Sequence, residues 1–219
     1  MLVEFNDVSL VENIGTYQEK VLFNHIHFKC LPNEVTLIKG DSAIYKIGRL
    51  ILNFIKPTLG QVIVGDYHLS SNTLIKDIKN YRANIGYLPY EYDEMFNYEQ
   101  VNNILKEALY QYDFKTEDAS LLAQDILNEV GLYIDFTKHS LKEFKSIDRY
   151  RLFLASILIY DPQVVILEQV IFDYKIKELI EKLKSKNKTV ILIGNYNVEC
   201  DKTFVVSDGL VREVKSEAK

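Results

Sequence analysis

Residues 34–54 read EVTLIKGDSAIYKIGRLILNF, and this stretch decides the fold class. Its first six residues, 34–39, are mostly apolar and predict a short β-strand. Apolar residues then recur at helical spacing from Ile47 to Phe54, which predicts a helix that is ended by Pro57. A strand that passes through a short loop into a helix indicates an α/β core.

Strand and helix patterns extend from this unit in both directions. Apolar or alternating runs predict strands before it, at 2–8 and 21–28, and after it, at 61–64 and 85–88, with a helix at 72–81. The middle of the chain changes to patterns that predict three helices, at 98–110, 117–130 and 146–160. The tail is expected to hold a strand at 164–167, a helix at 172–186, a strand at 189–193 and a hairpin of 204–206 with 210–214.

The composition is that of a soluble globular domain. The chain has 219 residues, 47% of them hydrophobic and 26% charged, which supplies ample apolar material for a core. The net charge of -5 gives the surface no general attraction for nucleic acid, so no nucleic-acid partner is expected. Cys30 and Cys200 lack metal-ligand spacing and are expected as reduced thiols of a cytosolic protein. No window approaches the ~18 uninterrupted apolar residues of a membrane span, so any membrane role is expected to come through a partner.

Six segments, in their order and spacing, resemble the nucleotide-binding domain of ATP-binding-cassette (ABC) transporters along nearly the whole chain. The strand, loop and helix of 34–54 lie where this family has its phosphate-binding loop. The other five segments are KPTLGQV at 56–62, IGYL at 85–88, EVGL at 129–132, the helix, Asp-Pro turn and strand of 155–167, and SDG at 207–209. The resemblance is closest to the compact type of domain that serves small bacterial exporters.

This resemblance implies an α/β, ABC-ATPase-like P-loop fold. It implies an antiparallel β portion, a mixed or parallel core sheet flanked by helices, and an inserted helical subdomain. The whole chain, 1–219, is expected to form a single domain of this type. Within it, 1–89 and 157–219 are expected to form the α/β core, and 90–156 the helical subdomain.

The phosphate loop has lost part of its chemistry. A working loop needs glycines that let backbone N–H groups wrap the phosphates, a Lys for the phosphate oxygens and a Ser or Thr for Mg²⁺. The family pattern has the same residues at the positions of Gly40, Ser42 and Lys46, so these three are the candidate residual nucleotide-binding residues. Tyr45 stands in place of the glycine before the Lys, and Ile47 in place of the metal-binding hydroxyl. Lys46 is therefore either a remaining phosphate ligand or an ordinary surface Lys.

Other positions of the family's ATP site are replaced as well. The strand of 164–167 should end in an Asp that orients Mg²⁺ and a Glu that polarises the attacking water. The two residues here are Glu168, a candidate metal ligand through its longer side chain, and Gln169, which cannot accept a proton. The alternative is that Glu168 and Gln169 are simply two polar residues at the end of a strand and have no role in metal binding. The Q-loop and H-loop positions hold Tyr90 and Asn195.

Three further motifs depart from the family pattern. The signature position, FKSID at 144–148, has no pair of glycines to offer N–H groups to a γ-phosphate across a dimer. The position of the aromatic that stacks on adenine falls near Glu12, and Tyr17 is a substitute only if the hairpin loop is longer. The loop that follows the catalytic strand is also shortened, with Asp173 as its expected remnant.

The framework of the family is thus retained while its chemistry is lost. The predicted function is a subunit like the ATP-binding subunit of an ABC transporter that has lost ATP hydrolysis and has a structural or regulatory role. No catalytic residue is assigned and no cofactor is required; ATP with Mg²⁺ is the open alternative. The expected partners are a membrane permease subunit, another ABC ATPase subunit or both, with a homodimer also open. The expected location is the cytoplasm, at the inner face of the cell membrane.

A partner interface is predicted near the Q-loop position. Tyr90, Tyr92 and Phe96 lie there, and exposed aromatic side chains are typical of protein interfaces. Two other functions stay open at this point. One is a divergent subunit that still binds ATP and energises an exporter, using Lys46 and Glu168. The other is a stand-alone cytosolic scaffold.

Overall fold

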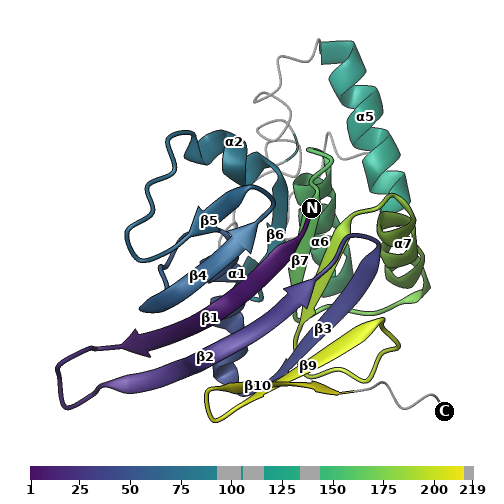
Figure 1. Ribbon diagram of the computed structural model, residues 1–219. Coiled ribbons are helices and arrows are strands. Elements are labelled where there is room, and N and C mark those ends of the chain that lie inside the picture. The colour runs from purple at the N-terminus through teal and green to yellow at the C-terminus, as the bar shows by residue number, and fades with distance from the viewer. Residues whose placement is uncertain (93–104, 106–115, 134–143, 215–219) are drawn as a thin grey trace.

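The structure of the protein is a computed structural model that describes residues 1–92, 105, 116–133 and 144–214. In this part of the chain the strands build two β-sheets, and helices pack against them (Figure 1). The first sheet consists of β1 (Val3–Glu12), β2 (Lys20–Cys30), β4 (Leu59–Val64) and β5 (Tyr67–Leu69). Its strands lie in the order β2-β1-β4-β5, and all neighbours are antiparallel.

The second sheet is mixed and has six strands. They are β3 (Glu34–Gly40), β6 (Ile85–Leu88), β7 (Val164–Glu168), β8 (Thr189–Ile193), β9 (Lys202–Ser207) and β10 (Leu210–Val214). The order is β10-β9-β3-β8-β7-β6, in which β9 and β10 are antiparallel and the other pairs are parallel. All residues of β7 and β8 are buried, which explains their continuous apolar sequence, because central parallel strands are covered on both faces. The carboxyl ends of β3 and β7 therefore meet at one edge of this sheet, where the candidate site lies.

Helices cover the sheets and complete two apolar cores. The described helices are the single 3₁₀ turn η1 (Ser42–Ile44), α1 (Tyr45–Ile51), α2 (Ile78–Ala83), α5 (Thr116–Glu129), α6 (Ser146–Leu158) and α7 (Tyr174–Ser185). In the first core, α1 packs against both sheets through side chains such as Ile47, which contacts the cluster that contains Phe5. The second core contains Leu154 of α6 and Leu179 of α7 together with Val165 of β7. Figure 1 shows α5 above α7, and Leu127 near the end of α5 is buried in the second core.

The structure confirms the predicted fold class and most predicted elements. The antiparallel sheet, the mixed sheet and the flanking helices are present as expected. The final hairpin turns at Asp208 and Gly209, whose φ angles of 52° and 76° are those of a two-residue hairpin turn. The helix expected at 98–110 lies outside the described residues.

The prediction that the helix after the loop runs to Phe54 is wrong. α1 ends at Ile51, and Asn53 has a φ of 53°, which turns the chain out of the helix. Two side chains of α2 bond the carbonyl groups that the helix end leaves without partners. The hydroxyl of Tyr81 donates to the carbonyl of Ile51, and Nε of Arg82 donates to the next carbonyl at 3.0 Å.

The prediction of one helix over 72–81 is wrong in its first half. The Oγ1 of Thr73 accepts a hydrogen bond of 2.8 Å from the N–H of Ser70, which holds this stretch in a turn. α2 begins only at residue 78 because the carboxylate of Asp77 caps it, accepting from the N–H of Asn80 at 3.0 Å. Helical spacing of apolar residues was therefore a weaker signal than the capping carboxylate.

The expected division into an α/β core and a helical subdomain stays a prediction. Its boundary between residues 156 and 157 falls inside α6, two residues before the end of that helix. None of the helices in the described residues is both long enough and apolar enough to span a membrane.

Candidate functional site

The loop after β3 is held by the backbone of β9 and by one distant side chain. Gly40, the last residue of β3, has a φ of 144°, and a Cβ on it would lie 1.9 Å from the carbonyl oxygen of Val206. Only glycine fits there. Asn195 bonds the same residue twice: its Oδ1 accepts from the N–H of Gly40, and its Nδ2 donates to the Gly40 carbonyl, both at 3.0 Å. The residue at the H-loop position therefore fixes the phosphate loop.

The next residues of the loop close on themselves. The N–H of Asp41 donates to the Val206 carbonyl at 3.3 Å. The Asp41 carboxylate accepts from the N–H of Ala43 at 2.9 Å, and its carbonyl accepts from the N–H of Ile44 at 3.2 Å. This makes η1 a capped 3₁₀ turn. Backbone N–H groups that a phosphate loop offers to an anion have acceptors inside the chain here.

Lys46, in the first turn of α1, forms an ion pair instead of standing free. Its Nζ lies 2.6 Å from Oε1 of Glu12, the last residue of β1. Both side chains are partly exposed, at 29% for Lys46 and 40% for Glu12. The position where an adenine-stacking aromatic was expected thus holds the counter-ion of the loop's lysine. Tyr17 lies in the exposed loop between β1 and β2 and is 97% exposed.

Three replaced positions contact one another beside the loop. The ring of Tyr45 lies 4.8 Å from the ring of Tyr90, measured between centroids. The hydroxyl of Tyr45 accepts a hydrogen bond from Nε2 of Gln169. The substitutes for the loop glycine, the Q-loop glutamine and the catalytic glutamate therefore form one cluster, and the tyrosine rings occupy space that glycine would leave open.

Glu168 is a buried carboxyl group with protein partners. It ends β7 and is 1% exposed. Its Oε1 accepts from the hydroxyl of Tyr87 at 2.9 Å, and its Oε2 accepts from the N–H of Tyr90 at 3.2 Å. Burial raises the pKa of this carboxyl to about 7, although the two donors and Arg49 oppose the shift. Gly48 packs against it so closely that a Cβ there would lie 3.1 Å from Oε1.

The structure gives the metal hypothesis for Glu168 little support. Across residues 1–92, 105, 116–133 and 144–214, no three His, Cys, Asp or Glu side chains gather, although a Mg²⁺ ion bound together with a nucleotide needs only one or two protein carboxylates. The carboxyl group is also engaged by Tyr87 and Tyr90, as described above. Its geometry is that of a structural group that ties β7 to the segment after β6.

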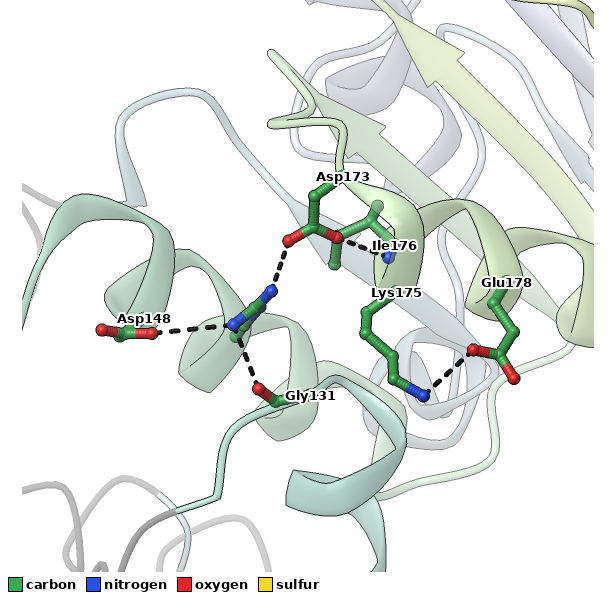
Figure 2. Close-up of polar contacts among 7 residues, drawn as sticks. Gly131, Asp148, Asp173, Lys175, Ile176 and Glu178 are labelled. Carbon is green, nitrogen blue, oxygen red and sulfur yellow. Dashed lines mark hydrogen bonds and ion pairs between the residues drawn. The ribbon is translucent and has the colours of Figure 1, made fainter.

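Asp173, which precedes α7, joins that helix to α6. Its carboxylate caps α7 by accepting from the N–H of Ile176 at 2.9 Å, and it also bonds the guanidinium of Arg151 on α6 (Figure 2). The same guanidinium donates to the carbonyl of Gly131 at 3.0 Å and lies 3.7 Å from the carboxylate of Asp148. The expected remnant of the shortened loop is therefore a structural joint between α5, α6 and α7.

The predicted partner interface needs a correction. Tyr92 is 8% exposed and packs edge-on against Tyr150 and beside Phe153 in the second core, so it offers no exposed aromatic surface. Tyr90 is 43% exposed, as the hypothesis requires. Phe96 lies outside the described residues. The interface hypothesis therefore keeps Tyr90 and Phe96 only.

Sequence reasoning missed one residue and one contact of this site. Tyr87 bonds the carboxyl group of Glu168, and in the sequence it stood only as part of a strand. The pairing of Glu12 with Lys46 was also missed, although both residues had been singled out separately. The opposite charges of these two residues, both expected in one site, could have predicted the ion pair.

The fold is that of ATP-binding cassettes. A cassette solved as a dimer in a post-hydrolysis state with ADP and Pi matches with a TM-score of 0.81 at 18% identity, over 99% of this chain and 100% of its own. CbiO1 from Clostridium perfringens, part of the ABC transporter complex CbiONQ, matches with a TM-score of 0.78 at 17% identity, over 96% of this chain and 86% of its own.

Comparison of the sequence with known proteins gives relatives of one kind. The chain is 23% identical over 222 residues to the energy-coupling factor transporter ATP-binding protein EcfA3 of Oenococcus oeni, covering 96% of this chain and 75% of that protein. It is 25% identical over 240 residues to EcfA2 of Enterococcus faecalis, covering 100% of this chain and 82% of that protein. No protein-family model matches the chain. The chain is thus similar to ATP-binding proteins of energy-coupling factor transporters.

Proposed function

We propose that this protein is an ABC-type subunit that does not hydrolyse ATP and that has a structural or regulatory role in a membrane transport complex. The observation that carries the proposal is the internal bonding of the phosphate loop. Four N–H groups of the loop, those of Gly40, Asp41, Ala43 and Ile44, bond to acceptors of the same chain, and so does the amino group of Lys46.

The residues of the site do not fit Mg²⁺-ATP. Ile47 has no hydroxyl for Mg²⁺ and is fully buried. Gln169 cannot accept a proton from water and instead donates to Tyr45. Loss of a single positioned transition-state group typically lowers the rate by about 10²–10³-fold. Since groups that act as a unit do not contribute additively, loss of several of them together leaves no useful hydrolysis.

The partners in this proposal follow from the relatives. EcfA2 and EcfA3 are named as ATP-binding proteins of a transporter, CbiO1 as part of a transporter complex, and one matching cassette was solved as a dimer. We therefore place this subunit on a membrane permease subunit, a second cassette subunit or both, with a homodimer as the alternative. Its location is then the cytoplasmic face of the membrane. Tyr90 and Phe96 belong to the proposed contact surface.

Calorimetry with Mg²⁺-ATP and a turnover assay test the loss of hydrolysis. The wild-type protein and Lys46→Ala should both give no turnover above background, with an ATP-hydrolysing cassette run in parallel to validate the assay. Wild-type turnover that Lys46→Ala abolishes would instead establish the divergent, ATP-driven subunit. ATP binding without turnover would leave the subunit non-catalytic but nucleotide-responsive, and it should raise the melting temperature of the wild type.

Capture of partners from membranes tests the docking role. The wild-type protein should retain an integral membrane protein after detergent extraction. Phe96→Glu and Tyr90→Glu should weaken that retention, whereas Tyr174→Glu, which charges a 76% exposed tyrosine on α7, should not. Recovery of a monomer without any membrane partner would favour the stand-alone scaffold. Equal retention by all three variants would remove Tyr90 and Phe96 from the interface.

A further inference from the structure

We propose that Glu12 is a built-in anion that closes the phosphate loop by occupying Lys46. The pair of Glu12 and Lys46 is called the latch below. This inference rests on the proposed function and adds a mechanism for the exclusion of polyphosphate from the loop. In this mechanism a carboxylate of the same chain competes with polyphosphate for Lys46. Loss of that carboxylate should therefore restore anion binding to the loop.

The two halves of the latch are anchored by different elements. Glu12 pairs with Lys20 across β1 and β2, and the residue before it, Val11, donates its N–H to Oγ1 of Thr58 at 2.9 Å. Lys46 belongs to α1, whose apolar face is buried in the first core. Neither backbone has to move for the 2.6 Å contact between Nζ and Oε1 to form. The latch is thus a preset feature of the fold.

The charges near the loop explain why the latch excludes an anion. Residues 40–48 carry two charged side chains, Asp41 and Lys46, which cancel each other. Glu12 adds one negative charge at hydrogen-bond distance from the only positive one of that stretch. Asp41, Lys46 and Glu12 together therefore carry one net negative charge, and Glu12 competes with a polyphosphate for the amino group of Lys46. Replacing Glu12 by a neutral side chain returns the sum to zero and frees the amino group.

The latch is also the part of the closed loop that can be opened without unfolding it. The side chains of Asn195 and Asp41 bond the backbone of Gly40 and Ala43, and these bonds hold the conformation of the loop. The latch joins two partly exposed side chains, and such ion pairs contribute little to stability. A neutral substitution of Glu12 therefore changes the charge at the loop and leaves its conformation in place.

Titration with sodium tripolyphosphate, a polyphosphate without a base, tests the latch. Glu12→Gln keeps the size of the side chain and removes its charge. By calorimetry Glu12→Gln should bind tripolyphosphate up to about fivefold more tightly than the wild type, and the double variant Glu12→Gln/Lys46→Ala should lose that gain. Melting curves verify that each variant is folded.

Glu4→Gln is the matched control. Glu4 lies on the same strand and pairs with Lys29 at 3.1 Å, roughly 25 Å along β1 from the latch. The Glu4→Gln variant should bind tripolyphosphate with the affinity of the wild type. Equal affinity of the wild type and Glu12→Gln overturns the latch, and so does an equal gain in Glu4→Gln or a gain that survives Lys46→Ala. The proposed function is judged separately, from ATP turnover by the wild type, so the two ideas fail independently.

Discussion

The buried carboxyl group of Glu168 should make the stability of the protein depend on pH. Its pKa is raised from 4.5 to about 7 because burial disfavours the charged form. The folded protein therefore holds this proton more tightly than the unfolded chain. The resulting stabilisation is complete below the unfolded pKa and is lost as the pH rises through about 7. The difference between the two pKa values, at about 1.4 kcal/mol for each pH unit, corresponds to about 3 kcal/mol.

Glu168→Gln removes the titration and keeps the shape of the side chain. Its amide oxygen can still accept from the N–H of Tyr90, which is 3.2 Å from the carboxylate in the wild type. Urea unfolding at a series of pH values measures the free energy of unfolding of both proteins. Between about pH 4 and pH 8, the stability of the variant relative to the wild type should rise by about 3 kcal/mol. The two proteins should differ least at the acid end, where both side chains are neutral.

Glu178→Gln serves as the control for a carboxylate at the surface. Glu178 pairs with Lys175 at 3.1 Å, and both side chains are exposed. Its substitution should shift the stability by no more than about 0.5 kcal/mol at any pH in the window. The reasoning about Glu168 is refuted if the difference between the wild type and Glu168→Gln stays constant within about 0.5 kcal/mol over the same window. That result would mean that burial does not hold the proton.

Three substitutions test the packing of the site by urea unfolding. Gly40→Ala should lower the free energy of unfolding by more than about 3 kcal/mol, because its Cβ would lie 1.9 Å from a backbone oxygen. Gly15→Ala, which has open space around it, should lower the same quantity by only about 1 kcal/mol. Similar losses in the two variants would contradict this reasoning. Asn195→Ala removes two hydrogen bonds and should cost about 1–2 kcal/mol, and an unchanged midpoint would count against their role. Arg151→Met should lower the free energy of unfolding by about 2 kcal/mol. A double-mutant cycle with Asp173→Asn should give a coupling energy above about 0.5 kcal/mol. Additive losses would show that the two residues act separately.

Most of the fold could be predicted because its strands are either fully buried or clearly alternating. β7 and β8 are continuous apolar runs, and their burial on both faces requires such runs. The errors fell where local bonding overrides periodicity. The end of α1 depends on Tyr81 and Arg82, which are some 30 residues away in the chain, and no helical pattern contains that information.

The site could be predicted only as a set of replaced positions. Gly40, Ser42, Lys46 and Glu168 were identified by their places in the sequence, but their bonding partners depend on tertiary contacts. The amide of Asn195, for example, reaches Gly40 across 155 positions of sequence. The burial of Tyr92 was missed for the same reason, since its neighbours in the core come from α6.

The cluster of Tyr45, Tyr90 and Gln169 makes each of these residues depend on the others. A return to glycine at position 45 would remove the acceptor of the Gln169 amide and the ring that packs on Tyr90. A return to glutamate at position 169 would replace the donor to the Tyr45 hydroxyl by a carboxylate. A change at either position thus breaks a contact with another residue of the cluster. An exchange of one of these residues therefore needs a compensating change in its neighbours.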